Sequence, residues 1–485
     1  MSKKYFYFFF LWVSFSLSAQ EGITYRLDAF GSLSSGNYTP FWIISNTYGV
    51  VPLKPNNGYL RGDVAWNQSF GKDIKLEAGI DLITAAKHTS DFWIQQLYAG
   101  LAYRNIHLTI GEKELYNSLL DNNLSQGDFN FSNNARPISE INISFPHFTT
   151  VPYTKGRLKF KADFAIGKFL DKNYVLRTKN QDAPYSVDML LHHKSLFFRL
   201  EDPKEKFPFL LTFGLSHSVQ WGGWTSSDNL GQLPESIKDF FKIVFPSSGD
   251  ENAPDGDQIN ILGNHLGAID VWLGYKSTNF QVSAYKQNFY EDNSGLEYAN
   301  WRDGIWGGEI TFFDRPFLKK AVLEFMQTTN QSGPLHFLFY DTNLVPGARG
   351  GGNDDYYNNY CYVNGWSYFG KSIGNPLLTS PEYNGDGTVH FKNNRLKSIH
   401  LGVEGKIAPA LSYRTLFTGM YAWGTMNTPF LKKKNNFSAL LECNYEPQKW
   451  KDWKMGFQLA FDKGSLYGDN FGCSLKVSKS GIIRF

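Results

Sequence analysis

Beyond its first twenty residues, the chain of 485 residues contains no apolar run of the roughly 20 residues that a transmembrane helix needs. Cysteine is scarce as well: there are three, Cys361, Cys443 and Cys473. An odd number excludes a complete disulfide framework, and no CxxC pair suggests a metal or redox site. Cys443 and Cys473 fall in line with apolar residues and are interpreted as small hydrophobic side chains. These absences exclude a helical membrane protein and a disulfide-stabilised small domain.

Catalytic motifs are also absent. The sequence has no GxSxG, no HExxH and no Walker-type phosphate loop. Its histidines are scattered: His192 and His193 are expected to mark a turn, and His400 with Glu404 is interpreted as a solvated pair rather than an acid–base couple. The net charge of +3 provides no basic stripe for nucleic acid. We therefore expect a protein that is not an enzyme, needs no cofactor and binds no nucleic acid.

Two loops are rich in side-chain oxygens, the ligands that calcium prefers. Neither has the full spacing of a calcium-binding loop, so solvated loop charge is favoured and no metal site is predicted. The loops are marked by Asp250, Glu251, Asp255 and Asp257, and by Asn384, Asp386 and Thr388.

The N-terminus has the pattern of a secretory signal. Lys3 and Lys4 precede an apolar run that continues to Leu17, and Ser18-Ala19-Gln20 supplies the small residues of an exit site. We predict cleavage after Ala19, which gives a signal peptide at 1–19 and one domain at 20–485. A retained signal anchor is the alternative, but the run is short for a span. No cysteine follows it, which disfavours a lipoprotein anchor.

Aromatic residues and glycine are abundant: 41 Phe, 27 Tyr, 13 Trp and 45 Gly. Aromatic girdles and glycine-rich turns of an outer-membrane barrel would use both. An aromatic-rich soluble β-sandwich or sugar-binding protein would use them too, so composition alone does not distinguish these folds from a barrel. The hydrophobic periodicity of the chain distinguishes them.

Many segments of about ten residues alternate between apolar and polar side chains, as strands between lipid and a wet lumen require. The last third of the chain shows this best. There Ile399, Leu401, Val403 and Ile407 oppose Ser398, His400, Glu404 and Lys406; Phe437, Ala439, Leu441, Cys443 and Tyr445 oppose Ser438, Glu442 and Asn444; and Phe471, Cys473, Leu475, Val477, Ile483 and Phe485 oppose Ser474, Lys476, Ser478, Ser480 and Arg484. A final amphipathic strand that stops on Phe485 resembles the C-terminal signature that outer-membrane barrels present to their assembly machinery. The pattern predicts an all-β transmembrane antiparallel barrel, with outer-membrane lipid and that machinery as partners.

Short and long connections alternate, as in a barrel with short periplasmic turns and long outer loops. About 19 segments qualify as strands, and since single-chain bacterial barrels have an even number, we predict about 18. One loop contains a helical pattern from Pro234 to Phe245, which has to cover its apolar face either in the lumen or on the membrane surface. The short connections are 71–73, 276–279, 315–318 and 408–410, and the long ones 36–58, 112–137, 222–264, 290–303 and 331–394.

Aromatic residues in the expected outer loops stand near amide and charged side chains. Sugars stack their C–H faces on aromatic rings, and Asn, Asp and Arg bind their hydroxyl groups. An aromatic girdle or a loop core is the alternative interpretation for any one of these residues. The predicted carbohydrate-binding residues are Trp221, Trp224, Asn264, Tyr290, Asp292, Trp301, Arg302, Asp303, Trp306 and Trp366.

Several segments, in matching order, resemble the capsule-assembly outer-membrane proteins called Wzi, over about residues 90 to 310. They are Gly111–Glu114, Ser132–Ile138, Gln220–Gly223, Asn264–Ala268 and Phe289–Gly295, followed by Asn300, Asp303-Gly304 and Trp306-Gly307. The resemblance implies an 18-stranded barrel in the outer membrane of a Gram-negative bacterium, with inward-folded loops and a helical element that closes the lumen. The helix expected at 234–245 agrees with this.

The resemblance also implies a lectin-like role, in which the protein holds capsular or exopolysaccharide on the cell surface without catalysis. A passive porin-like channel is the first alternative and would have an open lumen. An outer-membrane enzyme acting on lipid or glycan is the second, and it would need convergent catalytic side chains that the sequence does not place.

Overall fold

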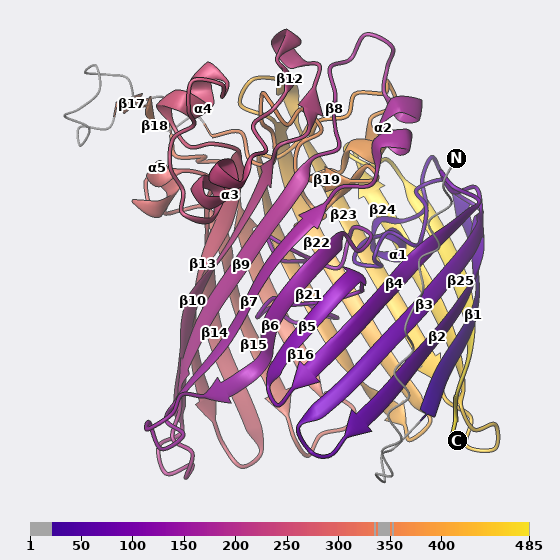
Figure 1. The fold of residues 1–485 in the computed structure, drawn as a ribbon. Helices are drawn as coiled ribbons and strands as arrows, with labels where there is room; N and C mark the ends of the chain where they lie inside the picture. Colours follow the sequence, from indigo (N-terminus) through magenta and orange to yellow (C-terminus); the bar gives the residue numbers. More distant parts are fainter. Residues whose placement is uncertain (1–21, 334–335, 338–349, 352–353, 485) are drawn as a thin grey trace, which may run out of the picture.

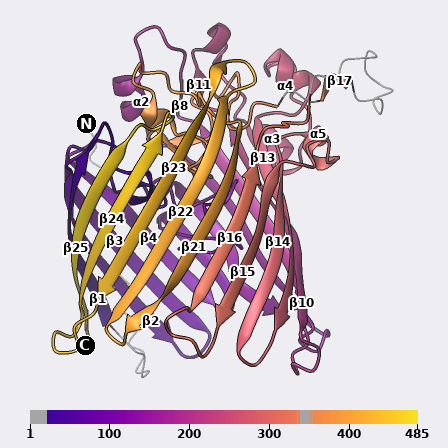
Figure 2. The ribbon, with the colours of Figure 1, turned by 180° about the vertical axis from the view of Figure 1, so that it is seen from behind.

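The computed structural model describes residues 22–333, 336–337, 350–351 and 354–484. The expected signal peptide at 1–19 and the terminal Phe485 lie outside these residues. The described chain forms one closed, wholly antiparallel barrel, in which each strand pairs with the next and β25 pairs back with β1 (Figures 1 and 2). Its strands are β1 (Gly22–Ser35), β2 (Gly58–Phe70), β3 (Ile74–Ala86), β4 (Phe92–Tyr103), β5 (Ile106–Glu112), β6 (Ser139–Thr150), β7 (Leu158–Lys168), β9 (Leu190–Leu200), β10 (Phe209–Trp221), β13 (Asn264–Lys276), β14 (Phe280–Tyr290), β15 (Gly304–Phe312), β16 (Lys320–Gln327), β21 (Leu396–Ala408), β22 (Leu411–Gly424), β23 (Pro429–Tyr445), β24 (Trp453–Gly464) and β25 (Asn470–Ile483).

These are 18 barrel strands, as predicted. The long connections all emerge at one end, which also carries the short helices, and the short turns lie at the other end, where the C-terminus is (Figure 1). Since outer-membrane barrels place long loops outside the cell, the helical end is the outer end. The remaining elements are α1 (Phe41–Ile44), α2 (Lys172–Thr178), α3 (Ile237–Val244), α4 (Asp255–Ile259), α5 (Asn293–Leu296), the 3₁₀ turns η1 (Ser227–Asn229) and η2 (Pro381–Tyr383), and the two-residue strands β8 (Ser186–Val187), β11 (Trp224–Thr225), β12 (Gly231–Gln232), β17 (His336–Phe337), β18 (Gly350–Gly351), β19 (Ser367–Tyr368) and β20 (Lys371–Ser372).

Burial along the strands is the reverse of that in a soluble sandwich. On β21, Ile399 is 60% exposed, whereas its neighbour His400 is fully buried. The apolar face is exposed because it meets lipid, and the polar face is buried because chain segments fill the lumen. None of the helices in the described ranges is long and apolar enough to cross a membrane.

Three inward-folded segments fill the lumen, and we call them the plug: residues 36–57 with α1, residues 113–138, and residues 354–395. His400 contacts the plug rather than solvent, because its ring nitrogens lie 2.7 Å from Thr418 Oγ1 and from the carbonyl oxygen of Leu124. The expected solvated pair with Glu404 is therefore wrong. His192 and His193 likewise lie within β9 and not in a turn.

Glu324 on β16 is a central anchor of the plug. Its carboxylate accepts hydrogen bonds from Ser125 Oγ and the Gln126 amide of the plug, both at 2.8 Å, and from Tyr285 of β14 at 2.7 Å. Glu114, at the start of the same plug segment, is held by Arg61 at 2.9 Å. Buried polar side chains of the wall thus find their partners in the plug.

The helix expected at 234–245 forms as α3, but it starts at Ile237 because Ser236 and Asp239 make a capping box. It lies outside the barrel: Lys194 Nζ, on the outward face of β9, donates to the Val244 carbonyl, while the neighbouring His193 points into the lumen. The expectation that this helix closes the lumen is therefore wrong. The loop leaves the outer rim and folds back over the outward face, where Ile243 and Val244 are buried. Three large side chains remain exposed on α3 and its C-cap: Ile237 (74%), Phe241 (57%) and the C-cap residue Phe245 (71%).

We predict that wild-type protein conducts few ions in a planar bilayer and that Glu324→Ala increases conductance. The substitution leaves three buried donors without an acceptor, and each costs about 1–3 kcal/mol, so the 113–138 segment is released from the wall. Glu404→Ala, near the short-turn end, is the matched control. Porin-like conductance of the wild type would contradict a closed lumen.

Candidate functional site

A pocket of about 390 Å³ opens at the outer end of the barrel, and we call it the mouth pocket. It is formed by the loops after β1 and β3, the plug residue Arg136, helix α2 and the plug segment around β20 and η2. Its charged and aromatic lining residues are Tyr38, Lys54, Lys87, His88, Arg136, Asp171, Tyr174, Phe369, Lys371 and Glu382.

Arg136 is the most unusual of these residues. Its guanidinium lies between the rings of Trp93 and Phe369, 4.3 Å from each centroid, and the residue is only 8% exposed. It forms no ion pair with any carboxylate in the described part of the chain, and one of its guanidinium nitrogens lies 3.4 Å from His88 Nδ1. Burial lowers the pKa of Arg136 to about 10. A buried cation without a carboxylate partner is costly, so the geometry favours an anionic ligand at this point.

The surroundings of Arg136 are electropositive. Burial, helped by the positive charges of Arg136 and Lys371, lowers the pKa of His88 to about 3, so this histidine is neutral. Lys371 is paired with Glu382 at 2.7 Å. Burial raises the pKa of the second lining carboxyl group, Asp171, to about 7, which keeps much of it neutral. The four lining cations are thus offset by one carboxylate that is already paired and by one acid that is only partly ionised near pH 7.

The pocket also has aromatic surfaces of the kind that sugars stack on. Phe369 and Tyr38 are partly exposed, and the ring of Tyr174 lies 5.7 Å from that of Phe369. Polar donors and acceptors come from Asn37 and Thr89 at the rim. The mouth pocket can therefore stack a sugar ring and bind a negatively charged substituent on it.

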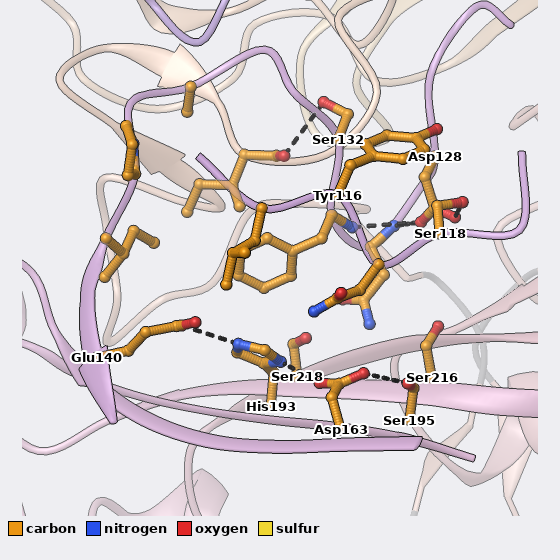
Figure 3. A pocket seen from close by; sticks show the side chains of 18 of the residues that line it. Tyr116, Ser118, Asp128, Ser132, Glu140, Asp163, His193, Ser195, Ser216 and Ser218 are labelled. Carbon is orange, nitrogen blue, oxygen red and sulfur yellow. Dashed lines mark hydrogen bonds and ion pairs between the residues drawn. The ribbon is translucent and has the colours of Figure 1, made fainter. Parts of the chain in front are cut away.

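A second cavity, which Arg136 also lines, lies between the plug and the wall (Figure 3). His193 bridges Asp163 at 2.8 Å and Glu140 at 2.9 Å, and Ser195 donates to Asp163. Its volume of about 80 Å³ holds only a few water molecules. The side chains around this cavity join the plug to the wall, and the cavity itself is too small to hold a sugar.

The structure does not gather the ten predicted carbohydrate-binding residues, all of them within the described ranges, into one place. None lines the mouth pocket. Five are buried and make structural contacts: Trp221 packs in a small core with Ile243, Asn264 donates to Gln220 at 2.9 Å, Tyr290 donates to the Ser216 carbonyl at 2.8 Å, Asp303 accepts from the Gln331 amide at 2.7 Å, and Trp366 donates to the Asn130 carbonyl at 2.7 Å.

The other five lie in outer loops or on the outer wall. Trp306 is 45% exposed on the outward face of β15, with Lys286 Nζ 4.3 Å from its ring centroid. Trp301 is 55% exposed, and the Arg302 guanidinium lies over its ring. Asp292 binds Ser294 of its own loop. Trp224 is 36% exposed beside Tyr185.

Sequence reasoning missed the mouth pocket because its residues come from several loops that are far apart in the chain. The one available signal was Arg136, a lone arginine in the segment Ser132–Ile138 that carries part of the resemblance. The predicted aromatic and polar residues, chosen as neighbours within one loop, lie instead at the rim or in the plug, and none of them lines the mouth pocket.

The family model described as "Capsule assembly protein Wzi" matches residues 42–380. Among solved structures, Wzi of Escherichia coli, described as a carbohydrate-binding outer-membrane barrel involved in group 1 capsule assembly, is 14% identical, with 95% of this chain and 84% of that chain covered and a TM-score of 0.58. At this identity the likeness concerns the fold. OccK5 (OpdH) of Pseudomonas aeruginosa is 10% identical, covers 96% and 98% of the two chains, and has a TM-score of 0.48. No curated protein matches the sequence.

We predict that the loops around α2 are more stable in acid and lose stability as the pH rises through about 7. The pKa of Asp171 is about 7 in the folded protein and 3.8 ordinarily, so the folded state binds the proton more tightly. The stabilisation is complete below about pH 4, is lost through about pH 7 and amounts to roughly 4 kcal/mol at most. Asp171→Asn should flatten the profile of the unfolding midpoint between pH 4 and 8. Asp182→Asn, at an exposed position, should leave it unchanged; equal profiles for all three proteins would contradict the assignment.

Proposed function

The chain belongs to the capsule assembly protein Wzi family, and from this membership we propose that it binds surface polysaccharide in the mouth pocket and holds it at the cell during capsule assembly. It is an outer-membrane barrel of a Gram-negative bacterium. The main support for this site is Arg136, which is buried at the outer end of a filled barrel and has no carboxylate partner among the described residues. Its charge favours an acidic polysaccharide, in which a carboxylate or phosphate supplies the missing partner.

The filled lumen argues against the porin-like alternative. Three plug segments occupy the interior, and Gln287 of β14, Glu324 of β16 and His400 of β21 bind them through buried hydrogen bonds. A polysaccharide is therefore expected to rest on the outer end rather than pass through.

We also propose that binding is not accompanied by catalysis. Hydrolysis of a glycosidic bond needs two free carboxyl groups that face each other across the bond. Of the two carboxyl groups that line the mouth pocket, Glu382 is paired with Lys371, and Asp171 is buried at the N-cap of α2. Neither is placed to act on a bound sugar.

Outer-membrane lipid and the barrel-assembly machinery are further proposed partners. Lipid contact is supported by the exposed apolar face of the strands, such as Ile399 and Leu475. Recognition through Phe485 rests on the sequence pattern.

In cells that lack the gene, we expect polysaccharide to be made but shed, and the wild-type gene should restore cell-bound material. Arg136→Met should lower the bound fraction without lowering barrel abundance, because it removes a buried charge and leaves no carboxylate behind. We expect about a tenfold loss of affinity, as for one charge-assisted hydrogen bond. Lys319→Met, at a short turn, is the matched control. If the deletion strain keeps the same fraction of polysaccharide bound to the cell, the proposed function is wrong. If only the Arg136→Met strain retains polysaccharide normally, the proposed site is wrong.

Trp224, Trp301 and Arg302 are proposed as secondary contacts for a long polysaccharide, since they are the predicted binding residues with exposed side chains in outer loops. Trp301→Ala should reduce retention less than Arg136→Met does, and wild-type retention would remove Trp301 from the site. Asp303→Ala is unsuitable as a test, because Asp303 is buried and holds the backbone of Asn330 and Gln331.

A further inference from the structure

The barrel wall has a step at β5. This strand has seven residues, and its last pair with β4 joins Leu97 and Glu112. Beyond that pair, β4 continues toward the outer end as far as Phe92, with no barrel strand of the described chain on that side. Gly111 at the tip of β5 has φ +112°, and a Cβ there would lie 2.1 Å from the Leu97 carbonyl oxygen, so a glycine is needed where the strand stops.

A cavity of about 530 Å³ occupies this step, and we call it the side opening. It is lined by side chains of both faces of the wall. Ile94, Leu97 and Leu170 are 43%, 52% and 50% exposed on the outside. Arg136 and Phe369, which belong to the filled interior, form its floor. The opening therefore leads from the lipid side of the barrel to Arg136.

The side opening lies at the level of the outer leaflet. Phe92 and Tyr103, at the two ends of β4, are 62% and 48% exposed on the outward face. Eleven residues of a strand tilted by about 45° span roughly 25 Å along the membrane normal, which matches the apolar band between two aromatic girdles. Ile94 and Leu97 lie just inside the outer girdle.

An exposed strand edge and a buried cation are both unfavourable next to hydrocarbon unless a polar group meets them. Glu112 lies near Arg136 but is not within ion-pair distance of it. Arg136 also lines the mouth pocket, so the side opening and the mouth pocket meet at one guanidinium. An occupant with an apolar chain, an anionic headgroup and an attached glycan matches all of these features.

We propose that the side opening binds an anionic glycolipid of the outer leaflet. Its acyl chain lies along Ile94, Leu97 and Leu170, its phosphate or carboxylate meets Arg136, and its sugars continue into the mouth pocket. The last part rests on the proposed function of that pocket. The protein then holds a glycan at its membrane-proximal end, where lipid and polysaccharide meet.

The test uses photocrosslinking in intact cells with the full-length protein. Leu170 is replaced by p-benzoylphenylalanine, and Ile399, which is 60% exposed on the lipid-facing side near the outer end of β21 and away from the opening, is replaced in the matched control. We expect a glycolipid adduct, detected by carbohydrate stain and mass spectrometry, about tenfold stronger at Leu170 than at Ile399. Adding Arg136→Met should reduce the Leu170 adduct by about the same factor.

The other outcomes each overturn the proposal. Equal adducts at Leu170 and Ile399 mean that the opening does not select a lipid. A phospholipid adduct alone means that no sugar is required, and an adduct with protein means that another chain covers the opening. Binding of lipid-free capsular polysaccharide to purified wild-type protein is measured in parallel. If it binds while Leu170 captures no glycolipid, the proposed function stands and this inference fails; if it does not bind, the proposed function fails independently.

Discussion

Backbone hydrogen bonding in the absence of water is the constraint on which the rest of this structure depends. A strand in hydrocarbon has to pair on both edges, and the pairing of β25 with β1 achieves this by closing the ring. Closure fixes the alternation of every strand, with one face toward lipid and the other toward the lumen. The wall departs from this rule at the tip of β5: beyond it, the edge of β4 that faces away from β3 has no strand neighbour within the described chain, and a charged side chain lies behind it.

The polar lumen creates a second requirement. Glu324, His400 and Asp462 would need water or a partner, and the plug supplies one to each: Ser125 and Gln126 to Glu324, the Leu124 carbonyl to His400, and the Phe41 amide, at 3.0 Å, to Asp462. The plug is thus part of the folded interior, with a core of buried aromatic rings such as Phe129 stacked on Phe289. A rigid plug in turn gives the mouth pocket a fixed shape and holds Arg136 between two rings.

This arrangement explains why most residues in the segments that resemble the family are buried and make structural contacts. Ser132 donates to the Gly374 carbonyl at 2.6 Å, Gln220 donates to the Gly365 carbonyl at 3.0 Å, and Asn300 donates to Tyr356 at 2.7 Å. Each joins the wall or an outer loop to the plug, or one plug segment to another. Within this set, Arg136 differs because its donors have no carboxylate partner in the described chain.

The sequence by itself determined the class of fold, a strand number of about 18 and the positions of most long loops, although not of the loop between β7 and β9 that contains α2. These follow from alternation, turn residues and length, which are local properties that every strand repeats, as in Ile399 against His400. Only the tertiary structure decided which loops fill the lumen, on which side of the wall α3 packs, and which residues form the outer pocket. Asp303 and Trp366 are residue types found in sugar sites, but both are buried, whereas Arg136 is far in the chain from Phe369 and Lys371 and meets them in space. Local patterns record which face a side chain takes, but the partner of an inward-folded loop depends on long-range contacts that no periodicity encodes.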